Sequence, residues 1–389
     1  MGYNVKTART VAAAALGIAV SAGIVAACGF DEVGAGGVVP GTEGGSAIDA
    51  RPAVDAPPDD VDASDSSIVP DGAQPCSAEI ATDALNCGRC GHSCLGGTCA
   101  AGMCQPTTLA TRGSPHDLVV DATDVYWTDK GDAILPPAAE RCPKAGGAVV
   151  RVAKGVAGTN VPESLVIGAG RVYITDSRFD VVAGCAPLGP DCPNPLISGE
   201  NGPFGIAWNG TQLFWSNRDS GTIRRAPPSL GSPTSIVQGR PSPKRIAASA
   251  THVAWTESGG IRISDVDGQN ENDVASATEP RDVAIDASFV YFATATEVRR
   301  AAFSGGGNTL LANGVDIQRL VVDATGFYFT DRANGGRVLR CPLAGCVSPL
   351  PREVVALGDS MVFGVAVDAT HVYWTNQAAT AGTIRRVAR

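Results

Sequence analysis

Histidine is the side chain best suited to acid–base chemistry near neutral pH, and the 389-residue chain contains only 4 of them. His92 lies within a cysteine-rich segment, and His252 and His371 each follow an Ala-Thr pair that is typical of a turn. General acid–base catalysis needs at least two converging groups, and the best pair that the sequence offers is His116 with Glu163. An enzyme of lactonase or lyase type would depend on this pair. Because no stronger set exists, we assign no catalytic residue and expect a protein that is not an enzyme.

Six cysteines between residues 76 and 104 could bind a metal ion or form disulfides. They are Cys76, Cys87, Cys90, Cys94, Cys99 and Cys104, and zinc sites also use a C-x-x-C pair with a histidine nearby. An even number of cysteines in an exported segment favours three disulfides, and we expect no metal. The fifteen pairings that six cysteines allow stay open. The segment resembles cysteine-rich modules of secreted myxobacterial proteins, and bridges would replace the hydrophobic core that so short a segment cannot form.

The cysteines beyond residue 104 indicate local bridges. We expect Cys341 to pair with Cys346, and Cys185 with Cys192, because each pair spans a short segment that contains proline and glycine. Cys142 begins a copy of the Cys-Pro-x-Ala-Gly motif, but a glycine stands where its partner would be. Cys142 is therefore the odd cysteine, either free or mispaired. A nucleophilic thiol needs an activating base, and no histidine near Cys142 in the sequence could supply one.

Two groups of carboxylates look like metal sites but have structural interpretations. One group consists of acidic residues that each follow an aromatic segment, namely Asp129, Asp176, Glu257 and Asp331. Such residues more often accept backbone hydrogen bonds and fix turns. Residues 265–270, Asp-Val-Asp-Gly-Gln-Asn, lack the spacing and the terminal glutamate of a calcium loop, and Asp-Gly is typical of a hairpin turn. We predict no metal site and no cofactor.

A sequence repeat after residue 104 must position these residues. Each of seven segments has an apolar run, a turn and an aromatic pair, as in residues 117–129, DLVVDATDVYWTD. The turn residues are Asp121, Gly168, Asn209, Ser249, Asp286, Asp323 and Asp368, which lie 37 to 47 residues apart. This is the length of one four-stranded propeller blade, and no helical period of useful length is present. We predict an all-β fold: a seven-bladed β-propeller of four-stranded antiparallel blades over residues 105–389.

The two ends of the repeat region indicate how the ring closes. The chain stops at Arg389 within the third strand of the last repeat, so that this blade lacks a fourth strand. Residues 107–111, Thr-Thr-Leu-Ala-Thr, match the fourth strand that precedes each later repeat. We predict that they complete the seventh blade, which would remove exposed sheet edges.

The segment Tyr126-Trp127-Thr128-Asp129 and its degenerate copies resemble the YWTD-type propellers of the low-density-lipoprotein-receptor class. The resemblance covers residues 105–389 at four or five positions per repeat, and that class typically has six blades. It implies a propeller that binds a partner, and it transfers no ligand to this chain.

Blade geometry places the start of each inner strand around one mouth of the propeller. This mouth ring consists of His116, Glu163, Phe204, Lys244, Arg281, Gln318 and Phe363. The residues that follow them include Asp117, Arg245, Asp282 and Arg319. Mouth-ring positions vary in charge and size between repeats, and variable positions on a rigid mouth are where specificity can reside. We predict a polar site for a peptide, a glycan or a small anion; a solvated ring of mixed charges is the alternative.

The N-terminal segment predicts export and anchoring. Lys6 and Arg9 precede an apolar run that ends at Ala27, which is typical of a signal peptide over residues 1–27. The ending Val-Ala-Ala-Cys28 resembles the bacterial lipobox. The resemblance implies that Cys28 is diacylated and anchors the chain in a membrane, and Gly29 after it implies sorting to the outer membrane.

The net charge of −9 belongs to the segment between this anchor and the cysteines. Residues 30–75 contain ten acidic residues and one basic residue, Arg51, and lack an apolar period. We therefore expect residues 28–75 to be a disordered linker, followed by the cysteine module 76–104. The rest is near neutral, without the basic stripe of a nucleic-acid-binding protein. We expect a monomeric cell-envelope lipoprotein, at the outer membrane or cell surface, that presents the propeller to an unknown protein, peptide or glycan. A structural envelope protein is the further alternative.

Overall fold

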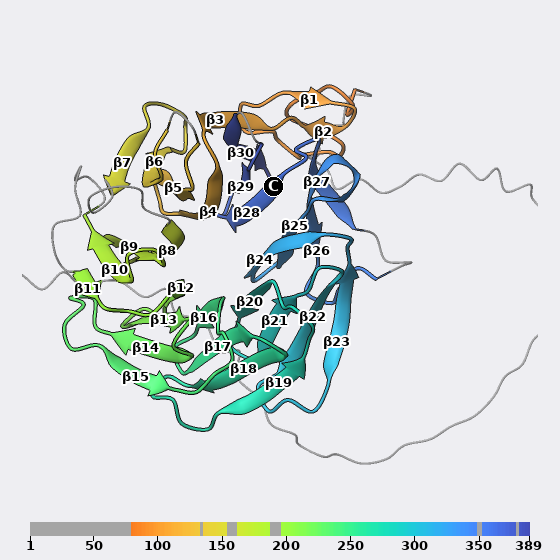
Figure 1. Ribbon diagram of the computed structural model, residues 1–389. Coiled ribbons are helices and arrows are strands. Elements are labelled where there is room, and N and C mark those ends of the chain that lie inside the picture. The colour runs from red at the N-terminus through yellow and green to blue at the C-terminus, as the bar shows by residue number, and fades with distance from the viewer. Residues whose placement is uncertain (1–78, 133–134, 154–161, 187–195, 348–351, 379–380) are drawn as a thin grey trace, which may run out of the picture. The chain divides into compact units, whose positions relative to one another are not determined.

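The computed structural model describes residues 79–389, except for 133–134, 154–161, 187–195, 348–351 and 379–380. Seven four-stranded antiparallel sheets are arranged as blades around a common centre (Figure 1). In each blade the first strand lies nearest the centre and the fourth lies at the rim. The predicted seven-bladed β-propeller is confirmed.

The blades follow one another in chain order. The first three comprise β4 (Pro115–Val120), β5 (Asp124–Asp129), β6 (Ala138–Pro143) and β7 (Val150–Ala153); β8 (Pro162–Gly168), β9 (Arg171–Asp176), β10 (Val181–Cys185) and β11 (Leu196–Ser198); and β12 (Pro203–Trp208), β13 (Leu213–Asn217), β14 (Thr222–Ala226) and β15 (Thr234–Val237). The fourth and fifth comprise β16 (Ile246–Ala248), β17 (His252–Glu257), β18 (Gly260–Asp265) and β19 (Asn272–Ser276); and β20 (Asp282–Ile285), β21 (Phe289–Ala293), β22 (Glu297–Ala302) and β23 (Asn308–Asn313). The sixth and seventh comprise β24 (Ile317–Asp323), β25 (Gly326–Asp331), β26 (Arg337–Cys341) and β27 (Glu353–Leu357); and β28 (Val362–Val367), β29 (His371–Asn376), β30 (Gly382–Ala388) and β3 (Thr107–Arg112).

The seventh blade combines both ends of the propeller. Strand β3 pairs antiparallel with β30, with Thr107 opposite Arg386 and Arg112 opposite Gly382. In Figure 1 the orange β3 lies beside the dark blue β30. The predicted closure by residues 107–111 is confirmed, and β30 is thereby paired on both sides.

The aromatic positions of the repeat form the scaffold between blades. Trp127, Trp215, Trp255 and Trp374, all on second strands, are fully buried. Each belongs to a cluster that combines neighbouring blades; Trp374, for example, packs in one cluster with Tyr328 of the sixth blade. Burying such a side chain contributes about 2–3 kcal/mol. A single blade could not bury it, so stability depends on contact between neighbouring blades.

The polar residue that marks each repeat makes the turn between the first and second strands. Asp121 Oδ1 accepts hydrogen bonds from the backbone N–H groups of Thr123 and Asp124, both at 2.8 Å. The hydroxyl of Tyr126 donates to Asp121 Oδ2 at 2.9 Å. Gly168 replaces the polar residue in the second blade, because an added Cβ would lie 2.5 Å from the ring of Trp208.

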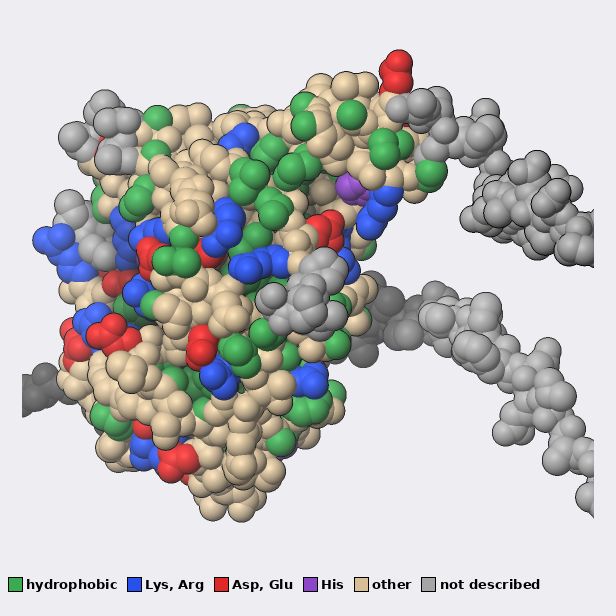
Figure 2. All heavy atoms as spheres, turned by 90° about the vertical axis from the view of Figure 1, so that its right-hand side faces the viewer, with side chains coloured by type: hydrophobic (Ala, Val, Ile, Leu, Met, Phe, Trp, Pro, Cys, Tyr) green, Lys and Arg blue, Asp and Glu red, His purple; other side chains and the backbone are tan. Residues whose placement is uncertain are grey.

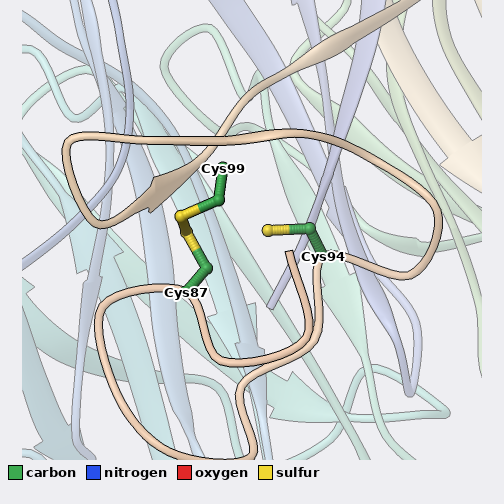
Figure 3. A group of neighbouring side chains, drawn as sticks. All are labelled: Cys87, Cys94 and Cys99. Carbon is green, nitrogen blue, oxygen red and sulfur yellow. A yellow bond between two sulfur atoms is a disulfide. The ribbon is translucent and has the colours of Figure 1, made fainter. Parts of the chain in front are cut away.

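The cysteine module contains disulfides and a short hairpin, β1 (Cys99–Ala100) with β2 (Met103–Cys104). Cys87 is bonded to Cys99 and Cys94 to Cys104, and Cys90 is also disulfide-bonded. Figure 3 shows the sulfur of Cys94 pointing toward the Cys87–Cys99 bridge, and the three sulfur atoms are close enough for a metal site. Because these sulfurs are in disulfides, they cannot act as thiolate ligands.

The module packs against the propeller, which the sequence analysis did not predict. Cys87, Cys94 and Cys104 belong to one buried cluster with Tyr328 of the sixth blade and Val387 of the seventh. A groove of about 270 Å³ lies between the module and these blades. On the side of the molecule shown in Figure 2, charged side chains of both signs are interspersed among hydrophobic ones. The surface there has no large region of a single charge.

The other cysteines follow the expected pattern where the structure describes them. Cys341 and Cys346 form the predicted disulfide. Cys185 is disulfide-bonded, and Cys192 lies outside the described residues. Cys142 is free and buried, and burial raises the pKa of its thiol to about 11. This cysteine is therefore a protonated, inert core residue at neutral pH.

The N-terminal predictions concern residues that the structure does not describe. The signal peptide 1–27, the lipidation site Cys28, the linker 28–75 and Cys76 all lie outside the described residues. In the described part of the chain, the 3₁₀ helix η1 (Ala333–Gly335) is the only helix. No helix in that part is long and apolar enough to cross a membrane.

Candidate functional site

The mouth ring lies where the inner strands depart from regular pairing. In five blades the register between the first and second strands shifts, at Pro115/Leu118, Pro162/Ser164, Pro203/Ile206, Ile317/Leu320 and Val362/Val365. The residues inside these shifts include His116, Phe204, Gln318 and Phe363. A register shift leaves backbone groups without a strand partner and re-aims a side chain. These mouth residues therefore lie outside the regular hydrogen bonding between the first and second strands.

At these shifts a hydroxyl of the second strand forms hydrogen bonds to the backbone, and in four blades it also joins the blade to its neighbour. Thr375 Oγ1 accepts a hydrogen bond from Gly364 N–H of its own blade at 2.8 Å and donates to His116 O of the first blade at 2.7 Å. A Cβ on Gly364 would lie 2.5 Å from the same carbonyl, so the close approach requires glycine. The equivalent hydroxyls of Thr175, Ser216 and Thr330 donate to the carbonyls of Phe204, Lys244 and Phe363. A hydroxyl residue that recurs in the repeat thus fixes the backbone of a mouth-ring residue that varies between repeats.

Six of the seven mouth-ring residues line one cavity. The cavity has a volume of about 790 Å³ and is lined by the predicted His116, Phe204, Lys244, Arg281, Gln318 and Phe363. Its wall also includes the turn between β17 and β18 and the connection between β19 and β20. Glu163 is absent from the lining, because Lys130 Nζ lies 2.6 Å from its Oε2 and Ser177 Oγ donates to its Oε1 at 2.7 Å.

His116 and Glu163 do not form the acid–base pair that an enzyme would need. The imidazole of His116 interacts with the backbone of Glu163, not with its carboxylate. Burial, reinforced by the charges of Arg245, Lys130 and Arg332, lowers the pKa of His116 well below its usual range. Its ring packs against Phe363 with centroids 4.0 Å apart, and its Nδ1 is buried without a hydrogen-bond partner. His116 is therefore a neutral, packed side chain at physiological pH.

Below the mouth cavity, polar side chains of the inner strands form a throat, defined here as Asp117, Ser164, Arg245, Asp282 and Arg319. Arg245 reaches from the fourth blade to the first, where its NH1 lies 3.0 Å from Asp117 Oδ2. Ser164 of the second blade donates to the same oxygen at 2.6 Å. These contacts connect three blades across the centre of the ring.

The other two throat residues, Asp282 and Arg319, are held by backbone hydrogen bonds and by an aromatic contact. The carboxylate of Asp282 accepts hydrogen bonds from the backbone N–H groups of Val283 and Leu320, at 3.0 and 2.9 Å. Burial raises the pKa of Asp282 to about 7, although Arg245 and these hydrogen bonds oppose the shift. Arg319 packs on Phe363, with its guanidinium carbon 4.0 Å from the ring centroid.

A second cavity of about 400 Å³ runs along the inner strands, and all five throat residues are part of its wall. Most of its lining is apolar, with Leu118, Val166, Ile206 and Val321 among the residues. Arg245 and Arg319 line both cavities. These two arginines therefore lie at the boundary between the mouth cavity and the second cavity.

The acidic residues at the ends of second strands are structural, as predicted. Asp129 accepts from the backbone of Ser114 and Gly131, and Asp331 accepts from the backbone of Asp316 and Ala333. Glu257 binds the Arg240 guanidinium and the indole N–H of Trp255. Residues 265–270 form the β18–β19 turn, in which Gly268 N–H donates to Asp265 O at 2.9 Å. This turn confirms the hairpin interpretation of the segment.

The mouth can hold a ligand by charge and by aromatic contact. Four cationic side chains line its cavity, Lys244, Arg245, Arg281 and Arg319, against the acidic Glu257 and Glu279. Glu257 is already paired with Arg240, 2.5 Å away. The sequence analysis did not predict that Lys130 and Arg332 lie close enough to His116 to lower its pKa. Both residues lie in connections outside the aligned positions of the repeat.

Known structures share this architecture. Among solved structures, 1036 chains are similar to this one. A streptogramin B lyase structure is 12% identical, covers 72% of this chain and 97% of that chain, and has a TM-score of 0.56. The computationally designed Ika8 protein is 10% identical, covers 72% of this chain and 98% of that chain, and has a TM-score of 0.51. A chain of a nidogen/laminin complex is 19% identical, covers 55% of this chain and 84% of that chain, and has a TM-score of 0.41.

No protein-family model matches the chain, and no curated protein matches it. At the sequence identities found among solved structures, similarity concerns the fold and not the activity. The chain therefore shares the β-propeller fold with the lyase and with the designed protein.

Proposed function

We propose that the chain is an exported, membrane-anchored lipoprotein whose propeller is a binding module, with its ligand in the mouth cavity. One observation carries this proposal: six side chains of five residue types, from six blades, converge on one cavity of about 790 Å³. Buried hydroxyls of the repeat hold the backbones of four of these residues, whereas the side chains vary in charge and size around the ring. A rigid scaffold with variable side chains at one mouth is the usual arrangement of a recognition site.

The chemistry of the mouth supports binding more than catalysis. The Glu163 carboxylate is occupied by Lys130 and Ser177, and His116 is packed against Phe363. A general acid and a general base must both reach the reacting atoms. Neither side chain is arranged to do so, and the cations and aromatic rings beside them are suited to holding a ligand.

A lyase-type enzyme is the second candidate, and one observation favours it. His116 Nδ1 is buried without a partner, so a neutral imidazole keeps a lone pair that could accept a proton if the Phe363 contact opened. The shared fold with a streptogramin B lyase makes this activity worth testing.

Binding and turnover can be separated in one experiment on the full chain. Glycan and peptide arrays would be probed with the unchanged protein and with the Phe204→Ala and Lys244→Ala variants. Arg171→Ala is the matched control, since Arg171 begins β9 just after the turn between the first and second strands, at the end of the blade away from the mouth. We expect ligands whose binding is lost in both mouth variants and kept in the control.

Each ligand would then be incubated with the protein and examined by mass spectrometry. Recovery of the intact ligand supports a binding module. Conversion that disappears in a His116→Gln variant would make the lyase the primary function. Binding that survives both mouth variants would contradict the proposed site, and the structural envelope role would then become the leading interpretation.

A further inference from the structure

Arg319 is a buried cation without a counter-charge. Its side chain lies in the throat, and the residue is 8% exposed. Its NH1 donates to the backbone carbonyl of Gln318 at 2.9 Å, and its Nε has no hydrogen-bond partner. Within the described residues, Arg319 forms no ion pair. Burying a charged group without compensation is unfavourable, so such a group in a cavity wall calls for an explanation.

The nearby acidic groups are engaged elsewhere. Asp117 Oδ2 is shared by Arg245 and Ser164. Asp282 accepts its hydrogen bonds from two backbone N–H groups. The remaining cations of the mouth add positive charge: Arg281 lies 3.9 Å from Asp316, a loose contact, and Lys244 has no ion pair among the described residues.

From this arrangement we infer that the mouth binds an oxyanion, a carboxylate, phosphate or sulfate group, at Arg319. This inference rests on the proposed function and gives the ligand a chemical class. An incoming oxyanion would supply the charge that the throat does not offer to Arg319. A guanidinium binds such groups through its N–H edge, whereas its face is free to stack.

The aromatic residues of the mouth define what carries the oxyanion. The Arg319 guanidinium stacks on Phe363 at 4.0 Å, and that of Arg245 lies 5.3 Å from the ring of Phe204. Both rings line the mouth cavity. Phe363 already contacts Arg319 and His116, so a ligand would pack against the parts of the two half-buried rings that face the cavity. Aromatic rings pack well against flat apolar groups and against the faces of sugars. The ligand class is therefore an oxyanion attached to a flat ring, either an aryl group or an acidic sugar.

Matched probes on the full chain test this class without any mutation. Titration calorimetry in low-chloride buffer would compare benzoate with benzamide, glucuronate with glucose, and inorganic phosphate alone. We expect benzoate to bind at least tenfold more tightly than benzamide, and glucuronate at least tenfold more tightly than glucose. The benzoate and glucuronate arms distinguish an aryl carrier from a sugar carrier. If no probe binds, or if anions and neutral probes bind equally, the oxyanion inference is overturned.

Variants locate the binding at Arg319. Arg319→Met should weaken anion binding at least tenfold, and Arg319→Lys should retain part of it. The matched control is Arg300→Met, because Arg300 also stacks on a phenylalanine, Phe289 at 4.8 Å, and donates to one backbone carbonyl, but lies on β22 away from the mouth. Arg300→Met should leave anion binding unchanged.

Stability gives a second, ligand-free readout. If Arg319 is kept for binding, Arg319→Met should raise the thermal midpoint in the absence of anions. A lower midpoint combined with unchanged anion binding would show a structural role and overturn the inference. Equal binding of neutral and anionic probes that Phe204→Ala abolishes would leave the proposed function intact, whereas binding insensitive to both Phe204→Ala and Arg319→Met would contradict both proposals.

Discussion

Replacing Thr375 by valine should weaken the joint between the last and first blades. The side chain is fully buried, and its hydroxyl accepts from Gly364 N–H at 2.8 Å and donates to His116 O at 2.7 Å. Valine has nearly the same shape but leaves both backbone groups unsatisfied. At about 1–2 kcal/mol for each buried group, the free energy of unfolding should fall by about 3 kcal/mol.

The comparison variant is Thr256→Val in the fourth blade. Thr256 is equally buried and its hydroxyl accepts one hydrogen bond, from Arg245 N–H at 2.9 Å. Among the described residues it donates none to the fifth blade. One lost hydrogen bond predicts a decrease of about 1.5 kcal/mol. Since the entropy of unfolding scales with chain length, the expected decreases in thermal midpoint are about 5 °C for Thr375→Val and about 2–3 °C for Thr256→Val.

Circular dichroism of the full chain during heating would measure both midpoints. Thr375→Ser keeps the hydroxyl and should stay closer to the unchanged chain than Thr375→Val does. The reasoning fails if Thr375→Val and Thr256→Val lower the midpoint equally, or if Thr375→Ser lowers it as much as Thr375→Val. Either result would mean that the hydroxyl bridge does not stabilise the ring.

Three further predictions concern single residues. The folded pKa of Asp282, about 7 against an ordinary 3.8, means that the folded chain keeps a proton which the unfolded chain loses. The free energy of unfolding should therefore fall as pH rises from about 4 to 7, by up to about 4 kcal/mol in all. Urea titrations at several pH values should show this decrease in the unchanged chain and a smaller one in Asp282→Asn. Cys142, buried with a thiol pKa of about 11, should react with a thiol reagent only in denaturant, and fast labelling of the folded chain would contradict its core position. Cys28→Ser should abolish incorporation of a labelled fatty acid and release the chain from membranes, whereas unchanged incorporation would exclude Cys28 as the lipidation site.

The repeat predicted the seven-bladed ring because the interactions that build each blade involve residues close together in the sequence or in the next repeat. An aromatic pair on each second strand can be buried only against a neighbouring blade, so seven copies at blade length require seven blades. The turn residues, such as Asp121, act through hydrogen bonds to residues two and three positions later, which a sequence displays directly. Residues 107–111 were identifiable for the same reason, since they repeat the pattern of a fourth strand.

The candidate site was only partly predictable, because its contacts join distant segments. Glu163 was expected in the mouth, but Lys130, 33 positions earlier in the chain, pairs with its carboxylate. The sequence placed Asp117, Arg245 and Arg319 near one another without showing that Asp117 forms its ion pair with Arg245. The packing of the cysteine module on the propeller likewise depends on contacts that have no periodic signal.

The hydroxyl bridges have a consequence for how this scaffold can change over generations. His116, Phe204, Lys244 and Phe363 are each held through a main-chain oxygen, an atom that every amino acid possesses. Under the proposed binding function, substitution at these four positions would alter recognition without removing the bond that keeps neighbouring blades together. New specificities can therefore arise by single steps, with little loss of folding at each step. A combinatorial library restricted to these positions should consequently yield mostly folded members, which makes the ring a practical starting point for engineered binders.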